Sequence, residues 1–257
     1  MCMKITAVII THNEEKNIVR CLESLQGIAD EVVVVDSGST DKTEELCSKY
    51  DVRFEKHPWE GYSGQKNFAN GLATNYWILS IDADEALSDE LRNSIISLKQ
   101  SEISDTDVFS VNRLTNYCGH WIHHCGWYPD RKIRLFNRNA KHWTGEIHEI
   151  LADTGSATAE HHLHGDLLHY SYYGVEDHIR QADKFSTLTA QEAFRKGRKA
   201  SVAVIWFKPK WKFFKDFVIK GGFLDGYAGY QVCKISAFAT FMKYSKLRML
   251  QQNKNSK

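Results

Sequence analysis

Short apolar runs alternate with amphipathic segments along the first third of the chain. Residues 5–10 and 32–35 are rich in β-branched side chains, which indicates two strands, and residues 77–81 form another apolar run. After the first run, apolar side chains recur at the spacing of a helix, preceded by Asn13, a residue type that caps helices well. These helical positions are Ile18, Cys21, Leu22 and Leu25.

The same plan repeats after the second run. We expect a helix to about Tyr50, a strand at residues 52–54 and another helix at residues 63–73. Strands that alternate with helices form a parallel sheet with helices on both faces, and its ligand crevice lies at the carboxyl ends of the strands. The pattern therefore predicts an α/β fold with a mostly parallel sheet.

Polar loops follow three of these predicted strands. They begin at Thr11, at Asp36 and at Asp82. Because the carboxyl ends of parallel strands meet at one edge of a sheet, the three loops should converge on one crevice. Asp36 could accept hydrogen bonds from a ribose or a base edge, and residues 37–40 could offer backbone and hydroxyl donors.

Asp82 and Asp84 form a pair of carboxylates where the apolar run at residues 76–81 ends. Both can reach one ion where the strand turns, and hard oxygen ligands suit Mg²⁺ or Mn²⁺. Such an ion usually neutralises a phosphate. No glycine-rich dinucleotide motif or P-loop follows any of these strands, so a metal ion, rather than a glycine nest, would handle the phosphates.

The composition fits one α/β domain with an extension, because the chain has 257 residues, 42% of them hydrophobic and 25% charged. Its formal net charge of +1 conceals an uneven distribution. Residues 195–257 hold fifteen lysines and arginines against Asp216 and Asp225, a net charge of +13, whereas residues 1–194 carry −12. An acidic body with a basic tail indicates an anionic surface as a partner.

The six cysteines show no paired short spacing, and the N-terminus does not resemble a secretory signal, so we expect a reducing cytoplasmic compartment. Cys118 and Cys125 bracket His120, His123 and His124, which could form a zinc cluster. The spacing matches no standard zinc module, and it favours a loop of reduced thiols and polar histidines.

Six short motifs follow one another along the chain. The first three are IITHNEE at residues 9–15, VVDSGSTD at residues 34–41 and DADE at residues 82–85. The others are GWYPD at residues 126–130, RLF at residues 134–136 and WTGEIHE at residues 143–149. This series resembles the signatures of family 2 glycosyltransferases, and in particular the subgroup that adds glucose to the inner core of lipopolysaccharide. The resemblance, whose motifs span about residues 5–149, implies a Rossmann-like GT-A sheet.

The resemblance also implies a nucleotide-sugar site at the crevice. Asp82 and Asp84 would form the D-x-D motif that addresses ribose and metal, with Asp84 preferred as the direct ligand of the ion. Lys66 could meet a phosphate or the sugar, and the alternative is a solvated lysine on a helix. The other residues assigned to the UDP-sugar are Thr11, Asn13, Glu14, Asp36 and Ser39.

A transferase that inverts the anomeric carbon in one displacement needs a general base for the acceptor hydroxyl. Glu146, His148 and Glu149 are the candidates. In an extended segment Glu146 and His148 would share one face, but a turn at Gly145 could change that. The resemblance favours Glu149, with Glu146 second, and His148 as a metal ligand or a donor to one. A surface carboxylate or a hydrogen-bonded structural histidine is the alternative for each.

Aromatic and basic side chains gather near these acids. The aromatic residues could stack on sugar rings or could belong to the core, and the arginines could bind the phosphates of an acceptor. They are Trp121, Trp127, Tyr128, Trp143, Arg131, Arg134 and Arg138.

The last third of the chain differs in composition. Residues 175–196 predict a long polar helix, and residues 206–215 interleave aromatic side chains with lysines. Residues 221–242 are rich in aromatic and small residues, but Asp225 and Lys234 argue against a membrane-spanning helix. An interfacial helix at anionic headgroups explains both properties. Aromatic side chains that cover the catalytic core, with only the lysines exposed, are the alternative.

Together these observations predict a nucleotide-sugar-binding and catalytic GT-A domain at residues 1–170 and a helical, membrane-associating extension at residues 171–257. The predicted protein is a metal-dependent, inverting glycosyltransferase, with Mg²⁺ or Mn²⁺ as cofactor and no nucleic-acid partner. It would move glucose or another hexose from a UDP-sugar to a lipid-linked saccharide such as lipopolysaccharide core, at the cytoplasmic face of the inner membrane. A sugar-nucleotide nucleotidyltransferase and a non-catalytic basic membrane-binding protein are the alternatives.

Overall fold

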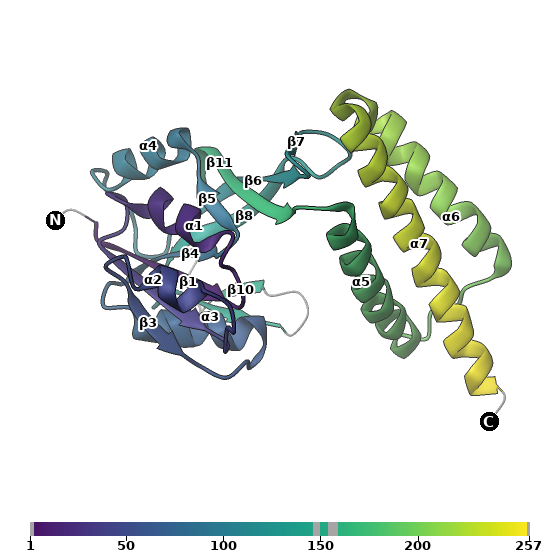
Figure 1. Ribbon diagram of the computed structural model, residues 1–257, viewed down its shortest axis with the longest axis horizontal. Helices are drawn as coiled ribbons and strands as arrows, with labels where there is room; N and C mark the ends of the chain where they lie inside the picture. The colour runs from purple at the N-terminus through teal and green to yellow at the C-terminus, as the bar shows by residue number, and fades with distance from the viewer. Residues whose placement is uncertain (1–2, 146–149, 154–158, 256–257) are drawn as a thin grey trace. The chain divides into compact units, whose positions relative to one another are not determined.

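The computed structural model describes residues 3–145, 150–153 and 159–255 and divides into two compact units (Figure 1). The first unit comprises residues 1–113 and 130–169, and the second comprises residues 114–129 and 170–257. The sequence-based division at residue 170 placed residues 114–129 with the catalytic domain, whereas the structure groups them with the C-terminal helices.

Four parallel strands form one half of the main sheet. They are β1 (Ile5–Thr11), β2 (Glu31–Asp36), β3 (Arg53–Lys56) and β4 (Trp77–Asp82), in the order β3-β2-β1-β4. The register pairs Thr11 with Asp36 and Ile10 with Asp82. The three polar loops therefore begin side by side at one edge of the sheet, as predicted.

Four further strands continue the same sheet beyond β4. Their order is β8 (Asp130–Asn137), β6 (Val108–Tyr117), β11 (Glu160–Tyr172) and β5 (Glu85–Leu87), while β7 (His120–Ile122) pairs with β6. A separate hairpin consists of β9 (Lys141–Thr144) and β10 (Ile150–Asp153). β8 runs antiparallel to β4 and β6, and β5 runs antiparallel to β11. β6 and β11 run in the same direction, because the backbone N–H groups of Val108 and Cys118 bond the carbonyls of Ala159 and Tyr172. The α/β class with a mostly parallel sheet is confirmed.

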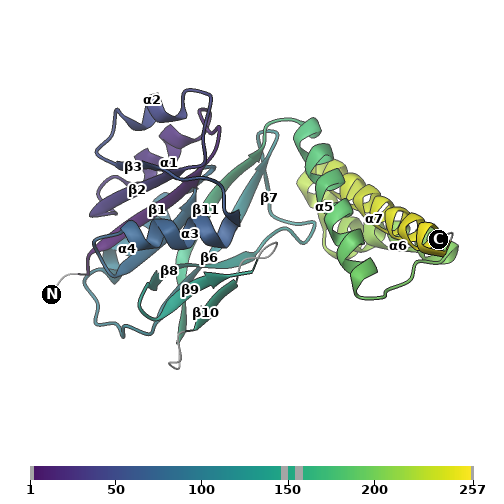
Figure 2. The same cartoon turned by 90° about the horizontal axis from the view of Figure 1, so that it is seen from below.

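Helices cover both faces of the parallel strands (Figure 2). One face packs against α1 (Ile18–Leu25), α2 (Thr43–Cys47) and α4 (Asp89–Leu98). The other packs against α3 (Gly61–Leu72) and the β9 strand. Successive side chains of a strand point to opposite faces, so Ile5, Ala7 and Ile9 enter the first cluster and Val8 the second. The four predicted apolar positions of α1 are its buried residues.

Two local predictions were wrong. Asn13 does not cap α1, because that helix begins at Ile18 after Asn17, and Asn13 itself has a φ of 56° within the preceding loop. The helix expected to reach Tyr50 ends at Cys47, where the backbone N–H of Tyr50 bonds back to the carbonyl of Cys47 in a turn. In both places side-chain and backbone hydrogen bonds of a loop replace the helical ladder.

The second unit is mainly helical. It contains α5 (Val175–Arg195), α6 (Val202–Phe214), the π-helix η1 (Lys215–Ile219), the 3₁₀ turn η2 (Gly222–Asp225) and α7 (Gly226–Asn255). α7 packs against both α5 and α6. The start of α7 packs closely against η2. Gly229 permits this approach, because a Cβ at that position would collide with the carbonyl oxygen of Gly222. Among the described helices, none combines the length and the apolar character needed to cross a membrane.

Candidate functional site

A pocket of about 660 Å³ opens where β1, β2 and β4 end, within the first unit. Its walls come from the loops that follow these strands, from α3 and from β11. Of the residues assigned from the sequence, Thr11, Glu14, Asp82 and Asp84 line this pocket. The hydroxyl of Thr11 is buried and has no hydrogen-bond partner among the described residues, which leaves it able to bond a ligand.

Two cations hold the carboxylate of Asp82. The ammonium group of Lys66 lies 3.2 Å from Oδ1, and Nη2 of Arg134 donates to Oδ2 at 2.9 Å. Burial alone would raise the pKa of Asp82, but the charges of Lys66 and Arg134 hold it well below the usual range. Asp82 is therefore ionised and fixed in orientation.

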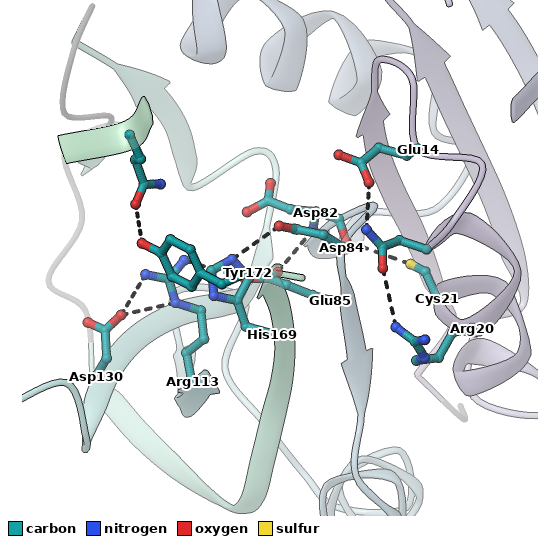
Figure 3. Close-up of polar contacts among 12 residues, drawn as sticks. Glu14, Arg20, Cys21, Asp82, Asp84, Glu85, Arg113, Asp130, His169 and Tyr172 are labelled. Atoms are coloured by element: carbon teal, nitrogen blue, oxygen red, sulfur yellow. Dashed lines mark hydrogen bonds and ion pairs between the residues drawn. The ribbon is translucent and has the colours of Figure 1, made fainter. Parts of the chain in front are cut away.

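The side chain of Glu85 bonds both Arg134 and the backbone of Asp82. Its side chain is fully buried and accepts a 2.5 Å hydrogen bond from Nη2 of Arg134 and a 3.0 Å bond from the backbone N–H of Asp82. Burial raises the pKa of Glu85, whereas Arg134 opposes that rise. Arg113 approaches Glu85 at 3.7 Å and also binds Asp130 through Nε and Nη2. Figure 3 shows Glu85, Arg113 and Asp130 near the turn formed by Asp82 and Asp84.

Asp84 faces a different partner. Its Oδ2 lies 3.2 Å from Nε2 of His169, which β11 brings to the pocket wall (Figure 3). Glu14 lines the same pocket, and its pKa rises to about 7, chiefly because it is buried and also because Asp84 and Asp41 add negative charge. A hydrogen bond from Asn17 opposes the rise. Glu14, Asp84 and His169 thus bring carboxylate oxygens and an imidazole nitrogen to one part of the pocket, and these are donor types that can bind a divalent cation.

The loops after β1 and β2 are tied to each other. The carboxylate of Asp36 accepts hydrogen bonds from the backbone N–H groups of Gly38 and Ser39, and from the Ser39 hydroxyl. Ser39 in turn accepts from the backbone of Asn13, whose side chain accepts from Thr40. Asp36 and Ser39 shape the loop in this structure, and neither lines the pocket. Their assignment to the nucleotide stays a prediction.

Lys66 is buried rather than solvated. Its side chain is 3% exposed, and its ammonium group stands 4.9 Å from the centre of the Trp143 ring as well as 3.2 Å from Asp82. The alternative of a solvated helix lysine was wrong, because α3 presents this face to the sheet. The neighbouring Asn67 bonds both the backbone N–H and the carbonyl of Trp143. α3 therefore connects the pocket to β9.

The candidates for the general base, Glu146, His148 and Glu149, lie outside the described residues. The structure places the residues that flank them, because Thr144 pairs with Ile150 across the β9–β10 hairpin. On the side of α3, the hydroxyl of Ser63 donates to the carbonyl of Gly145 at 2.6 Å. The roles assigned to the three residues remain predictions.

The metal assignment rests on Asp84, Asp82 and His148. In the part of the chain that the structure describes, no group of three or more His, Cys, Asp or Glu side chains is arranged to hold an ion. Asp82 is already neutralised by two cations, which favours Asp84 over Asp82 as a direct ligand. Asp84 and His169 are donor types that suit Mn²⁺ or Mg²⁺.

Aromatic side chains reach the pocket from an unexpected segment. Trp59 and Tyr62 line it, are 51% and 43% exposed, and meet edge to face with ring centres 4.9 Å apart. Sequence reasoning missed both, although two aromatic residues just before a predicted helix were a visible signal. By contrast, Trp143 packs in the core against Phe136 and Trp127 packs against Tyr117.

The three arginines considered for acceptor phosphates have other contacts. Arg134 is 4% exposed and bound to carboxylates, so it is not a surface fork. Arg138 donates to the carbonyls of Asn70 and Ala73 at the end of α3, and Arg131 lies 3.8 Å from Glu160. Among the described residues, the histidines near Cys125 form no metal cluster either, because Nδ1 of His124 contacts Asp225 at 2.8 Å.

Comparison with known proteins identifies close relatives of the whole chain. The model of the family "Glycosyl transferase family 2" matches residues 6–156. A protein of Rhizobium meliloti named lipopolysaccharide core biosynthesis glycosyltransferase LpsC is 31% identical, and the match covers 95% of this chain and 92% of LpsC. An uncharacterized glycosyltransferase of Rickettsia bellii is 34% identical over 96% of this chain and 87% of its own length.

A solved structure shares the fold. It is the mannosyltransferase PcManGT of Pyrobaculum calidifontis in complex with GDP-Man and Mn²⁺, with a TM-score of 0.55 and 16% sequence identity. The superposition covers 96% of this chain and 87% of PcManGT. At this identity the likeness concerns the fold alone, and it agrees with the GT-A architecture expected from the sequence.

Proposed function

Because the chain belongs to glycosyl transferase family 2, we propose that it transfers a hexose, glucose in the first instance, from a UDP-sugar to a lipid-linked saccharide with inversion at the anomeric carbon. The observation that carries this proposal is the pocket at the ends of β1, β2 and β4, where Asp82 and Asp84 lie beside Thr11 and Glu14. Its volume of about 660 Å³ lies within the range of sites for ligands of this size.

Each described residue would have a distinct role toward the donor. Asp82, held ionised by Lys66 and Arg134, would accept hydrogen bonds from the ribose hydroxyls. The Thr11 hydroxyl would bond the nucleotide, and the loop shaped by Asp36 would present Ser37 to it. Trp59 and Tyr62 offer aromatic faces on which a base or a sugar ring can stack.

A divalent cation, Mg²⁺ or Mn²⁺, would be held by Asp84 together with the diphosphate oxygens, with His148 as a further candidate ligand. When bound, such an ion stabilises the charge that develops on the departing diphosphate. The Mn²⁺ in the PcManGT complex supports this proposal, as does the position of Asp84 in the same pocket as Glu14 and His169. PcManGT holds GDP-Man, so the donor nucleotide must be tested as well.

The chemical step is a single displacement. The acceptor hydroxyl attacks the anomeric carbon, the bond from that carbon to the UDP oxygen breaks, and the hydroxyl proton passes to a carboxylate. We assign that carboxylate to Glu149, with Glu146 second. The name of LpsC, a lipopolysaccharide core biosynthesis glycosyltransferase, supports the proposed acceptor class, and such an acceptor would bring the protein to the cytoplasmic face of the inner membrane.

Calorimetry of UDP binding tests the donor site. The wild-type protein should bind UDP at least tenfold more tightly with Mn²⁺ than with EDTA. Asp84→Asn should lose this difference, whereas Asp89→Asn, an exposed position at the start of α4, should keep it. GDP added in place of UDP measures the nucleotide preference, and tighter binding of GDP would overturn the assignment of the donor.

Transfer assays test the base. Glu149→Gln should abolish transfer from the preferred UDP-sugar and leave UDP binding within about twofold. Parallel loss of binding and transfer would assign Glu149 to the donor site instead. Full transfer by Glu149→Gln together with none by Glu146→Gln would move the role to Glu146.

A further inference from the structure

An apolar groove of about 540 Å³ lies between α6 and α7 in the second unit. Ligand sites commonly have volumes of this order. The groove belongs to the helical unit, which holds none of the residues assigned to sugar transfer. Its apolar walls include Ile205, Trp206, Phe213, Ala237, Phe238 and Phe241.

Two lysines line the groove beside these apolar walls. The ammonium group of Lys210 stands 3.2 Å from the centre of the Trp206 ring, and that of Lys234 stands 4.9 Å from the centre of the Phe213 ring. No acidic side chain among the described residues forms an ion pair with either lysine. The groove thus combines a cationic rim with an apolar interior, which suits a ligand that has an anionic head and a hydrocarbon chain.

The surface around the groove has the same character. α6 has no buried residue, and Trp206, Phe207 and Phe214 are 66%, 58% and 47% exposed. Residues 202–220 carry five lysines and a single acidic residue, Asp216, which is buried and bound to Lys212 at 2.7 Å. Exposed aromatic side chains interleaved with lysines are typical of helices that lie at a membrane surface.

We propose that this face docks on an anionic bilayer and that the groove takes an acyl chain of one phospholipid, whose phosphate contacts Lys210 and Lys234. A free phosphate would leave the apolar walls exposed, and an uncharged lipid would offer neither lysine an anionic partner. The inference deepens the membrane location proposed above and rests on it, but it does not depend on the donor or on the transfer reaction.

Sedimentation of the full chain with vesicles tests the docking. The protein should bind vesicles of phosphatidylcholine and phosphatidylglycerol at least tenfold more tightly than vesicles of phosphatidylcholine alone. Lys210→Glu combined with Lys234→Glu should weaken binding to the anionic vesicles by on the order of tenfold or more. Lys184→Glu makes the same charge change at an exposed position of α5 and should have a smaller effect. Equal binding of the double variant and the wild type would overturn the proposal.

Fluorescence locates the acyl chain. Phospholipids with brominated acyl chains quench a tryptophan that contacts them, so Trp206→Phe should lower the quenched fraction while vesicle binding persists. Trp59→Phe removes a tryptophan of similar exposure from the pocket of the first unit and should not lower that fraction. Unchanged quenching in Trp206→Phe would exclude the groove. A dimer seen by ultracentrifugation without lipid, in which Trp206 is protected, would assign the face to a second copy of the chain instead.

The UDP calorimetry described above separates the two proposals. The lysine variants should retain Mn²⁺-dependent UDP binding, because the lysines lie in the second unit and the pocket lies in the first. Vesicle binding without UDP binding would reject the proposed function alone. UDP binding without vesicle binding would reject the inference alone.

Discussion

At the scale of single residues, Asp82 and Asp84 have different surroundings although they are two positions apart. Lys66 and Arg134 contact the carboxylate of Asp82, whereas His169 contacts that of Asp84. Asp82 is therefore a fixed acceptor whose charge is already balanced. Asp84 lies in the same pocket as Glu14, whose pKa its charge helps to raise. This difference is the physical basis for assigning the ribose to Asp82 and the metal ion to Asp84.

The buried pair of Arg134 and Glu85 should matter for stability. Arg134→Met would leave the buried carboxylate of Glu85 without its strongest partner, and breaking a buried ion pair costs about 3–5 kcal/mol. We expect the free energy of unfolding, measured by urea denaturation, to fall by about 3 kcal/mol. Arg131→Met, which removes an exposed contact at 3.8 Å, should change it by less than about 0.5 kcal/mol.

A second substitution shows whether Arg134→Met lowers stability through the unpaired charge of Glu85 or through loss of packing. If the unpaired charge causes the loss, Glu85→Gln combined with Arg134→Met should recover more than half of it, because the amide can be buried without a counter-charge. A double variant that is no more stable than Arg134→Met would attribute the loss to packing.

Glu14 should make stability depend on pH. Its pKa is raised from 4.5 to about 7 in the folded protein, so the folded state binds more protons than the unfolded state between these values. The stabilisation from the protonated carboxyl is complete below about pH 4.5 and is lost as the pH rises to 7. Glu14→Gln cannot lose a proton, so its stability relative to the wild type should increase between pH 5 and pH 8.

Urea denaturation in EDTA at both pH values measures this effect, which should be on the order of 1–3 kcal/mol. Glu102→Gln, an exposed position, is the matched control and should show no such trend. Adding Mn²⁺ at pH 8 should reduce the advantage of Glu14→Gln if an ion binds beside Asp84. A constant difference between the variant and the wild type at both pH values would contradict the raised pKa.

Local sequence revealed only part of the residue-scale arrangement. Asp82 and Asp84 were predictable because an apolar strand ends directly before them. Their partners Arg134 and His169 come from β8 and β11, and a pattern read along one segment carries no information on which distant strand is its neighbour. Lys66 was ambiguous for a related reason, since only the packing of α3 on the sheet decides that its ammonium group is buried.

At the scale of elements, α3 links the pocket at the ends of β1, β2 and β4 to the β9–β10 hairpin, whose strands flank the candidate bases. Lys66 contacts Asp82. At neighbouring positions of the same helix, Asn67 bonds the backbone of Trp143, and Ser63 bonds the carbonyl of Gly145. The side-chain amide of Asn67 satisfies two backbone groups of Trp143 at 2.8 and 2.9 Å. Because β9 leads directly into residues 146–149, this contact should position the segment that holds Glu149.

Asn67→Ala should therefore lower the turnover number for sugar transfer by about tenfold, since small displacements of reacting groups are costly. The KM for the donor should change by less than about twofold, because Asn67 does not line the pocket. Steady-state kinetics measures both values. Asn93→Ala, at an exposed position of α4, is the control. A rise in KM with unchanged turnover would show that Asn67 acts on donor binding.

The elements themselves were predictable to unequal degrees. β1, β2, α1 and β4 follow strong apolar patterns, and each was expected within a few residues of its observed bounds. β5 has only three residues and pairs with β11 far along the chain, so no local pattern marks it. The register that places β8 beside β4 likewise depends on long-range packing.

At the scale of the whole molecule, opposite charges occupy different parts of the chain. Residues 1–194 carry −12 and residues 195–257 carry +13. The basic part includes α6 and α7, whose lysines lie among exposed aromatic side chains. An anionic surface attracts this part and repels the acidic part, so the charge distribution should orient the protein on a membrane.

Salt should consequently separate the two binding activities. Raising NaCl from about 0.1 to 1 M shortens the Debye length from about 10 to 3 Å, which screens exposed lysines from a charged bilayer. Binding to vesicles with phosphatidylglycerol should weaken by at least tenfold. Binding of UDP with Mn²⁺ should change by less than threefold, because the proposed acceptor of the ribose, Asp82, is held by the buried cations Lys66 and Arg134. Vesicle binding that persists at 1 M NaCl would show that apolar insertion of α6 is sufficient, and the lysines would then serve only to orient the protein.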